Sequence, residues 1–88
     1  MSAACERLRH VLAINLREAR AAAGLTQQAV EDMTGVGAAN ISRIESSVWN
    51  VSIDTVAKIA AALGVDPGGL FVEGEPYRTG KTPAATKP

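Results

Sequence analysis

The side chains able to perform acid–base, nucleophilic or metal chemistry are few in this sequence and do not gather. His10 is the only histidine and Cys5 the only cysteine, which excludes an internal disulfide and a cysteine-rich zinc site. Asp32, Asp54 and Asp66 stand near the ends of predicted helices, where capping and the helix dipole explain them. No nucleophile has a base at catalytic spacing, and no glycine run has phosphate-loop spacing. We therefore expect no enzymatic activity, no metal and no cofactor.

The composition indicates one small helical domain. The chain has 88 residues, many of them alanine, with a single tryptophan, tyrosine and phenylalanine, and such small apolar side chains suit short packed helices better than strands. Nine basic and nine acidic residues cancel, so the net charge neither favours nor excludes a nucleic-acid partner. No apolar run reaches the roughly 18–20 residues that span a bilayer, and Glu6, Arg7, Arg9 and His10 interrupt any signal-peptide pattern. We expect a cytoplasmic protein with no membrane contact.

The first predicted helix runs over residues 2–23, which contain no proline or glycine. Gly24 is well placed to end it. Apolar residues recur along it at steps of three and four, which places them on one helical face: Leu8, Leu12, Leu16, Ala19 and Ala23.

Two further helices follow closely. Thr26 is a good N-cap for a helix over 27–34, and Gly35 ends that helix. The next helix is predicted over 38–46, with Ile41 and Ile44 facing inward.

Ser52 caps a fourth predicted helix, and Asp66 followed by Pro67 starts a short fifth one that carries Leu70 and Phe71. The inward stripe of the fourth helix is predicted to hold Ile53, Val56, Ala57, Ala60 and Leu63. The expected fold is all-α, a compact bundle of five short helices.

The chain divides into three predicted parts. Residues 1–7 extend the first helix, residues 8–72 form the domain, and residues 73–88, rich in proline and glycine, form a disordered tail. An inert, solvated tail is favoured over one that contacts phosphates through its basic residues, Arg78, Lys81 and Lys87.

The segment LTQQAVEDMTGVGAANISRIES reads as helix, tight turn, helix. It resembles the lambda-repressor-like, Cro-type (XRE) helix-turn-helix domain. The resemblance extends over about residues 12–71, because LREARAAAGLTQQ fits the first helix and NVSIDTVAKIAAALGVDPGGLF fits the later ones. One such pattern alone is weak, but these segments in order are specific.

The resemblance implies that the helix beginning at Ala38 lies in the major groove of double-stranded DNA while the preceding helix stands over the backbone. The positions that match base-facing ones are Ala38, Ala39, Asn40 and Arg43. Arg43 is the best candidate for a sequence-reading contact, since a guanidinium can pair with guanine O6 and N7. Asn40 suits adenine or a phosphate, and the alanine methyl groups suit a thymine methyl or simply let the helix sit deep.

The phosphate contacts and one structural ion pair are also implied by the family. Gln27 matches a glutamine that touches phosphate and braces the recognition helix. The expected phosphate contacts are Thr26, Gln27, Gln28, Ser42, Ser46 and Ser47. Arg20 and Glu45 match a salt bridge that ties the first helix to the recognition helix.

The sequence departs from the family at two places. Glu31 stands where a small alanine is usual, so this glutamate is expected to lean outward or to part the two helices. The loop after the recognition helix, Ser46–Asn50, lacks the usual glycine, lysine or arginine. Backbone N–H groups of Ser46 to Val48 and the two serine hydroxyls remain as phosphate donors, and a weak salt dependence is expected.

Trp49, Val51 and Phe71 are candidates for a contact between two copies of the chain, because members of this family often pair through this loop and the last helix. For Trp49, a lid on the core and a contact to the DNA backbone stay open as alternatives. A symmetric homodimer on a palindromic operator is expected.

The resemblance predicts a sequence-specific transcriptional regulator that binds double-stranded DNA, dimeric and acting as a repressor. The alternative is a protein-interaction module, or an antitoxin of the same fold, with a protein partner and weak or lost DNA binding. Zero net charge, Glu31, the two alanines and the uncharged loop favour this alternative.

Overall fold

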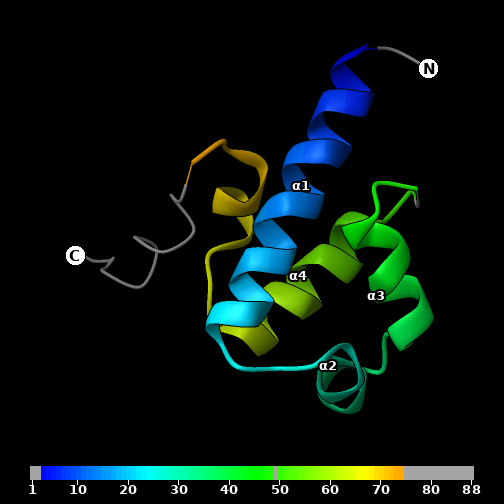
Figure 1. The fold of residues 1–88 in the computed structure, drawn as a ribbon, viewed down its shortest axis with the longest axis vertical. Helices are drawn as coiled ribbons and strands as arrows, with labels where there is room; N and C mark the ends of the chain where they lie inside the picture. Colours follow the sequence, from blue (N-terminus) through cyan, green and yellow to red (C-terminus); the bar gives the residue numbers. More distant parts are fainter. Residues whose placement is uncertain (1–2, 49, 75–88) are drawn as a thin grey trace.

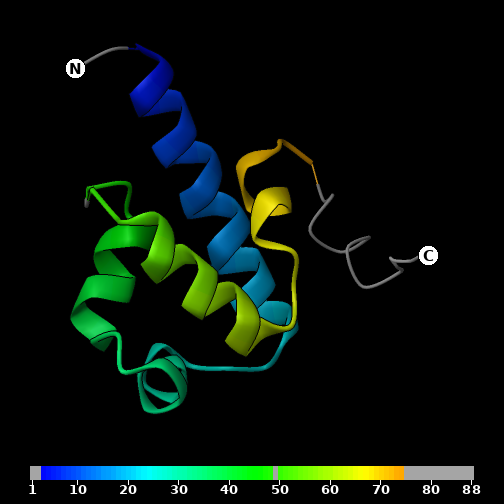
Figure 2. The same ribbon diagram turned by 180° about the vertical axis from the view of Figure 1, so that it is seen from behind.

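Five helical elements account for most of the chain in the computed structural model, which describes residues 3–48 and 50–74. They are α1 (Ala3–Ala22), α2 (Gln27–Thr34), α3 (Ala38–Glu45), α4 (Ile53–Leu63) and the 3-10 helix η1 (Pro67–Phe71). The described residues contain no strand, so the all-α prediction is confirmed, with the fifth element a 3-10 turn in place of an α-helix. Figure 1 shows α1 running through the molecule with α2 below it and α3 to one side; Figure 2 gives the reverse view.

The short helices begin and end where local signals predict. Thr26 Oγ1 accepts a hydrogen bond from the Ala29 N–H at 3.0 Å, and the Ser52 hydroxyl does the same for Thr55 at 3.1 Å. Gly35 and Gly64 end their helices in the left-handed region, at φ 80° and 72°, where a side chain would be strained.

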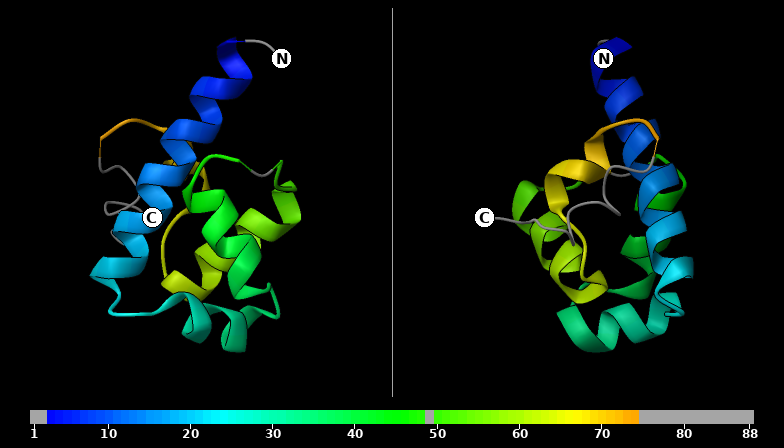
Figure 3. Two further views of the ribbon diagram at one scale, coloured as in Figure 1. Left: turned by 45° about the vertical axis from the view of Figure 1, so that its right-hand side comes forward. Right: turned by 90° about the vertical axis from the view of Figure 1, so that its left-hand side faces the viewer.

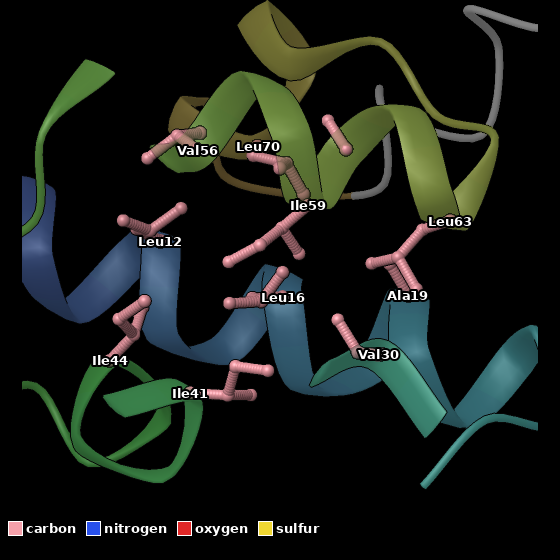
Figure 4. Packing of buried hydrophobic residues seen from close by; sticks show 11 residues of the cluster. Leu12, Leu16, Ala19, Val30, Ile41, Ile44, Val56, Ile59, Leu63 and Leu70 are labelled. Carbon is pink, nitrogen blue, oxygen red and sulfur yellow. The ribbon is translucent and has the colours of Figure 1, made fainter. Parts of the chain in front are cut away.

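One hydrophobic core joins the helices. α1 packs against α3 and η1, while α2 packs against α3 and α4. In Figure 4 the side chains of α1 lie between those of α4 and those of α3. The buried cluster consists of Leu12, Leu16, Ala19, Val30, Ile41, Ile44, Val56, Ile59, Ala60, Leu63 and Leu70.

Several residues of the predicted stripes are not in this core. Leu8 is 48% exposed because the first turns of α1 project beyond the other helices (Figure 1), and Ala23 follows the end of α1 and is exposed. In α4 the predicted inward face was wrong at two positions. Ile53, the first residue of the helix, is 73% exposed, and Ala57 is also exposed. Ile59, which the prediction did not include, is buried.

The C-terminal segment is held to α1 at two points. The buried Asn15 side chain donates to the carbonyl oxygens of Leu70 and Val72, at 2.9 and 2.8 Å. Arg7 and Glu73 form an exposed ion pair at 2.8 Å. Of the predicted tail, Glu73 and Gly74 are described, while Arg78, Lys81 and Lys87 lie outside the described residues. No helix of the described part is both long and apolar enough to cross a bilayer.

Candidate nucleic-acid interface

α2 and α3 meet through a connection of three residues at one end of the molecule, as the two views of Figure 3 show. α3 turns Ile41 and Ile44 into the core and leaves the opposite face uncovered. On that face Ala39 and Arg43, four residues apart, are exposed, and Ala38, Asn40 and Ser42 are half-buried. Of the four residues predicted to face bases, Ala39 and Arg43 are exposed, while Ala38 and Asn40 are half-buried.

Arg43 is the only basic residue in α2 and α3. Its Nη1 donates to Asn40 Oδ1 over 3.5 Å, a long and weak contact that leaves most of the guanidinium donors available. A planar guanidinium fork beside a carboxamide is a pair of groups suited to reading the edges of purines.

An ion pair fixes α3 relative to α1. Arg20 Nε lies 2.6 Å from Glu45 Oε2, and Arg20 Nη2 lies 3.0 Å from Glu45 Oε1, so the pair is bidentate. Glu45 is buried and Arg20 half-buried. The hydrogen bond that Arg20 donates to Glu45 raises the pKa of Arg20 above its already high ordinary value, which keeps the guanidinium charged. Arg20 also donates to the Leu25 carbonyl at 2.9 Å, which ties the start of α2 to the same group.

Gln27 belongs to this network. Its Nε2 donates to Glu45 Oε1 at 3.1 Å, so the first residue of α2 braces the last residue of α3. Thr26 and Gln28 are exposed beside it, and Gln28 Nε2 donates to Asp32 Oδ1 at 3.1 Å. The Ala29 N–H is used by Thr26 Oγ1. The first turn of α2 has no acidic residue, so its remaining N–H groups and its dipole can meet an anion.

The loop after α3 corrects one sequence interpretation. Ser47 N–H donates to the Ile44 carbonyl and Val48 N–H to the Arg43 carbonyl, both at 3.0 Å. With Ser47 in the left-handed region at φ 64°, this is a Schellman ending of the helix. Ser46 N–H is likewise used, bonding to Ser42 and Arg43 carbonyls. The backbone donors expected to hold a phosphate are therefore already occupied, and only the serine hydroxyls remain.

Glu31 behaves differently from its predicted role. It does not lean outward: its Oε1 accepts a hydrogen bond from Ala38 N–H at 2.8 Å, and the side chain is half-buried. This bond joins α2 to the first residue of α3. A side-chain cap supplied from another helix has no local sequence signal, which is why the sequence did not reveal it.

The predicted contact between copies is only partly described. Val51 and Phe71 are half-buried and pack against the core, while Trp49 lies outside the described residues. Val51 and Phe71 line a groove of about 200 Å³ that is also lined by the exposed Leu8 and Ile53. Elsewhere in the described residues, no three histidine, cysteine or acidic side chains gather in a way that would hold a metal ion.

A family model described as helix-turn-helix matches residues 16–70, more than half of the chain. The chain belongs to this helix-turn-helix family. The resemblance drawn from the sequence is thereby confirmed, and α2 and α3 are the two helices of the motif.

Two comparisons agree with the family. The chain is 38% identical over 58 residues to a protein of Neisseria meningitidis serogroup B (strain ATCC BAA-335 / MC58) named a hypothetical transcription factor, covering 66% of this chain and 55% of that protein. The chain thus spans little more than half the length of that curated relative. A crystal structure of the hypothetical transcription factor NHTF from Neisseria superposes with a TM-score of 0.70 at 35% identity, covering 74% of this chain and 75% of that one.

Proposed function

We propose that this helix-turn-helix protein is a sequence-specific regulator of transcription that binds double-stranded DNA as a symmetric dimer and represses, without enzymatic activity or a cofactor. The observation that carries the proposal is the network of Arg20, Glu45 and Gln27, which fixes α3 against α1 and α2 while Arg43 stays exposed beside the half-buried Asn40. A helix held by such a network and left uncovered on one side suits insertion into a groove.

The roles of the side chains follow from their positions. Arg43 and Asn40 read base edges, while Ala38 and Ala39 let the helix approach closely and contact thymine methyl groups. Phosphates are bound by the start of α2, through Thr26, Gln27 and Gln28, and by the hydroxyls of Ser42, Ser46 and Ser47. Few bases are specified in each half-site, because two of the four base-facing side chains are methyl groups.

The dimer forms, in this proposal, through the groove beside Val51 and Phe71. Leu8 and Ile53 border it and are 48% and 73% exposed, an apolar surface that a second copy of the chain would cover. The groove lies beside the start of α4, whereas the α2–α3 connection lies at the other end of α3 (Figure 1). Two copies joined there keep both α3 helices free for two half-sites of a palindrome.

Selection of bound duplexes from a random pool tests this function. The expected result is a short palindromic consensus whose two half-sites are about one helical turn apart. Binding of the selected duplex should weaken as salt rises, with a slope of log K against log salt no steeper than about −4, because few phosphates meet a basic group. No binding at low salt would favour the alternative, a protein-interaction module or antitoxin of this fold with a protein partner.

A further inference from the structure

Glu31 connects the two helices of the motif through a single strong hydrogen bond. It lies in the middle of α2, and its Oε1 accepts from the backbone N–H of Ala38 at 2.8 Å. Ala38 is the first residue of α3. The carboxylate therefore holds the end of α3 that enters a groove first in the proposed binding mode.

The start of α3 has no cap of its own. The other helices with a described cap use a side chain directly before them, from Thr26, Ser52 or Asp66. α3 follows Gly37, which offers no side-chain acceptor. Since α3 has only eight residues, the bond at its first residue and the Glu45 network at its last residue restrain its two ends, while Ile41 and Ile44 pack its middle into the core. Loss of the first bond leaves the first turn of α3 held only by its backbone bonds and by this packing.

The charge of Glu31 acts on the same end. A helix N-terminus carries a partial positive charge that attracts phosphate, and a carboxylate at 2.8 Å from its first N–H opposes that attraction. The start of α2 has no acidic residue and stays open to phosphate. Ala38 and Ala39 add no side-chain donor, so what this end of α3 contributes to recognition is its position.

We propose that Glu31 is a specificity-determining residue: its hydrogen bond to Ala38 holds α3 in the orientation that distinguishes the operator from other DNA, and its charge lowers affinity for any duplex. This rests on the DNA-binding function proposed above.

Three variants of the full chain separate the bond from the charge. Glu31→Gln keeps an oxygen acceptor and removes the charge. Glu31→Ala removes both, and alanine is the strongest helix former, so α2 stays helical. Asp32→Asn is the matched control. Asp32 is the next residue of α2 and is exposed, and its Oδ1 accepts a hydrogen bond from Gln28 of the same helix at 3.1 Å and none from α3.

Each variant is titrated with the selected duplex and with a scrambled duplex of equal length. Glu31→Gln should raise the affinity for both duplexes by roughly threefold, so the ratio of the two affinities stays that of the parent. Glu31→Ala should likewise tighten binding of the scrambled duplex, but it should lower the ratio of the affinities for the selected and the scrambled duplex by about tenfold or more. Asp32→Asn should leave the ratio unchanged. An unchanged ratio in Glu31→Ala overturns the proposal, as does an equal loss of ratio in Glu31→Gln.

A readout without DNA distinguishes this inference from the function on which it rests. Hydrogen exchange of the Ala38 amide should be slow in the parent and in Glu31→Gln, and much faster in Glu31→Ala. Equal exchange rates in all three overturn the role of the bond. If exchange behaves as expected but the parent binds no duplex at low salt, the DNA-binding function is overturned, and the specificity role with it, while the cap itself stands.

Discussion

Arg20 in α1 and Glu45 in α3 form a bidentate ion pair, with N–O distances of 2.6 and 3.0 Å, across a sequence separation of 25 residues. Only 6% of the Glu45 side chain is exposed, against 19% for Arg20. A carboxylate so buried is tolerated because the guanidinium and Gln27 satisfy its oxygens. The pair thus helps to set the position of α3, and the stability of the fold depends on it.

Arg20→Ala should lower the free energy of unfolding by about 3 kcal/mol, because it leaves a buried carboxylate without its partner. Urea denaturation followed by circular dichroism measures the loss. Arg17→Ala, at an exposed position of the same helix, is the control and should change stability little.

A double variant that removes both charges tests whether the cost of Arg20→Ala comes from the unpaired carboxylate. Arg20→Leu combined with Glu45→Leu should cost less than Arg20→Ala alone, since no unpaired charge remains buried. Retained stability in Arg20→Ala would contradict the role given to this pair.

Asn15→Ala should destabilise the fold by about 2 kcal/mol, because the Leu70 and Val72 carbonyls each lose a hydrogen bond from its amide. The same denaturation assay measures this. Glu73→Gln, which breaks only the exposed ion pair with Arg7, should cost well under about 1 kcal/mol. If both variants were equally stable, η1 would not depend on Asn15 for its attachment.

Ser47→Gly should stabilise the protein by about 1 kcal/mol. Ser47 stands at φ 64° in the left-handed conformation that ends α3, where a Cβ is unfavourable and glycine is not. The thermal midpoint should rise by several degrees for a domain of this size. Ser46→Gly, at φ −99°, is the matched control and should not stabilise; a similar gain in both would point to an effect unrelated to φ.

The elements that could be predicted from sequence are those with local causes. Thr26, Ser52 and Asp66 cap the residues directly after them, and Gly35 and Gly64 take the left-handed conformation that few other residues adopt. Such signals need no knowledge of the rest of the molecule, so the bounds of α2 and α4 follow from them.

What could not be predicted depends on how the helices are placed. The periodicity of α1 does not reveal that its first turns, with Leu8, extend past the bundle. In α4, Ile53 is predicted to face inward but is exposed, whereas Ile59, which is not part of the predicted stripe, is buried, because the position of α4 against the other helices decides which side is covered. The bond from Glu31 to Ala38 needs the relative placement of two helices. The Schellman ending at Ser47 lacks the glycine that would have revealed it.

Arg43→Ala should relax the sequence preference of the protein. If the Arg43 guanidinium reads a base pair, its loss lowers discrimination at that position by about 1–3 kcal/mol. Selection of duplexes by the variant should then return a consensus with one position less specified in each half-site. Lys58→Ala removes the same charge from an exposed site on α4 and should leave the consensus intact. Identical consensus sequences for Arg43→Ala and the parent would exclude a base-reading role for Arg43.

Ile53→Asp should weaken self-association without unfolding the chain. Ile53 is 73% exposed at the rim of the groove beside Val51 and Phe71, and a carboxylate there would be buried against apolar groups of a second copy. The fold should persist, because an acidic residue in the first turn of α4 interacts favourably with the helix dipole.

Ala57→Asp, at an exposed position of α4 outside this groove, is the matched control. Sedimentation equilibrium should show at least about tenfold weaker dimerisation for Ile53→Asp alone, together with weaker binding to a palindrome but not to a single half-site. Equal dimerisation by both variants would place the dimer interface elsewhere.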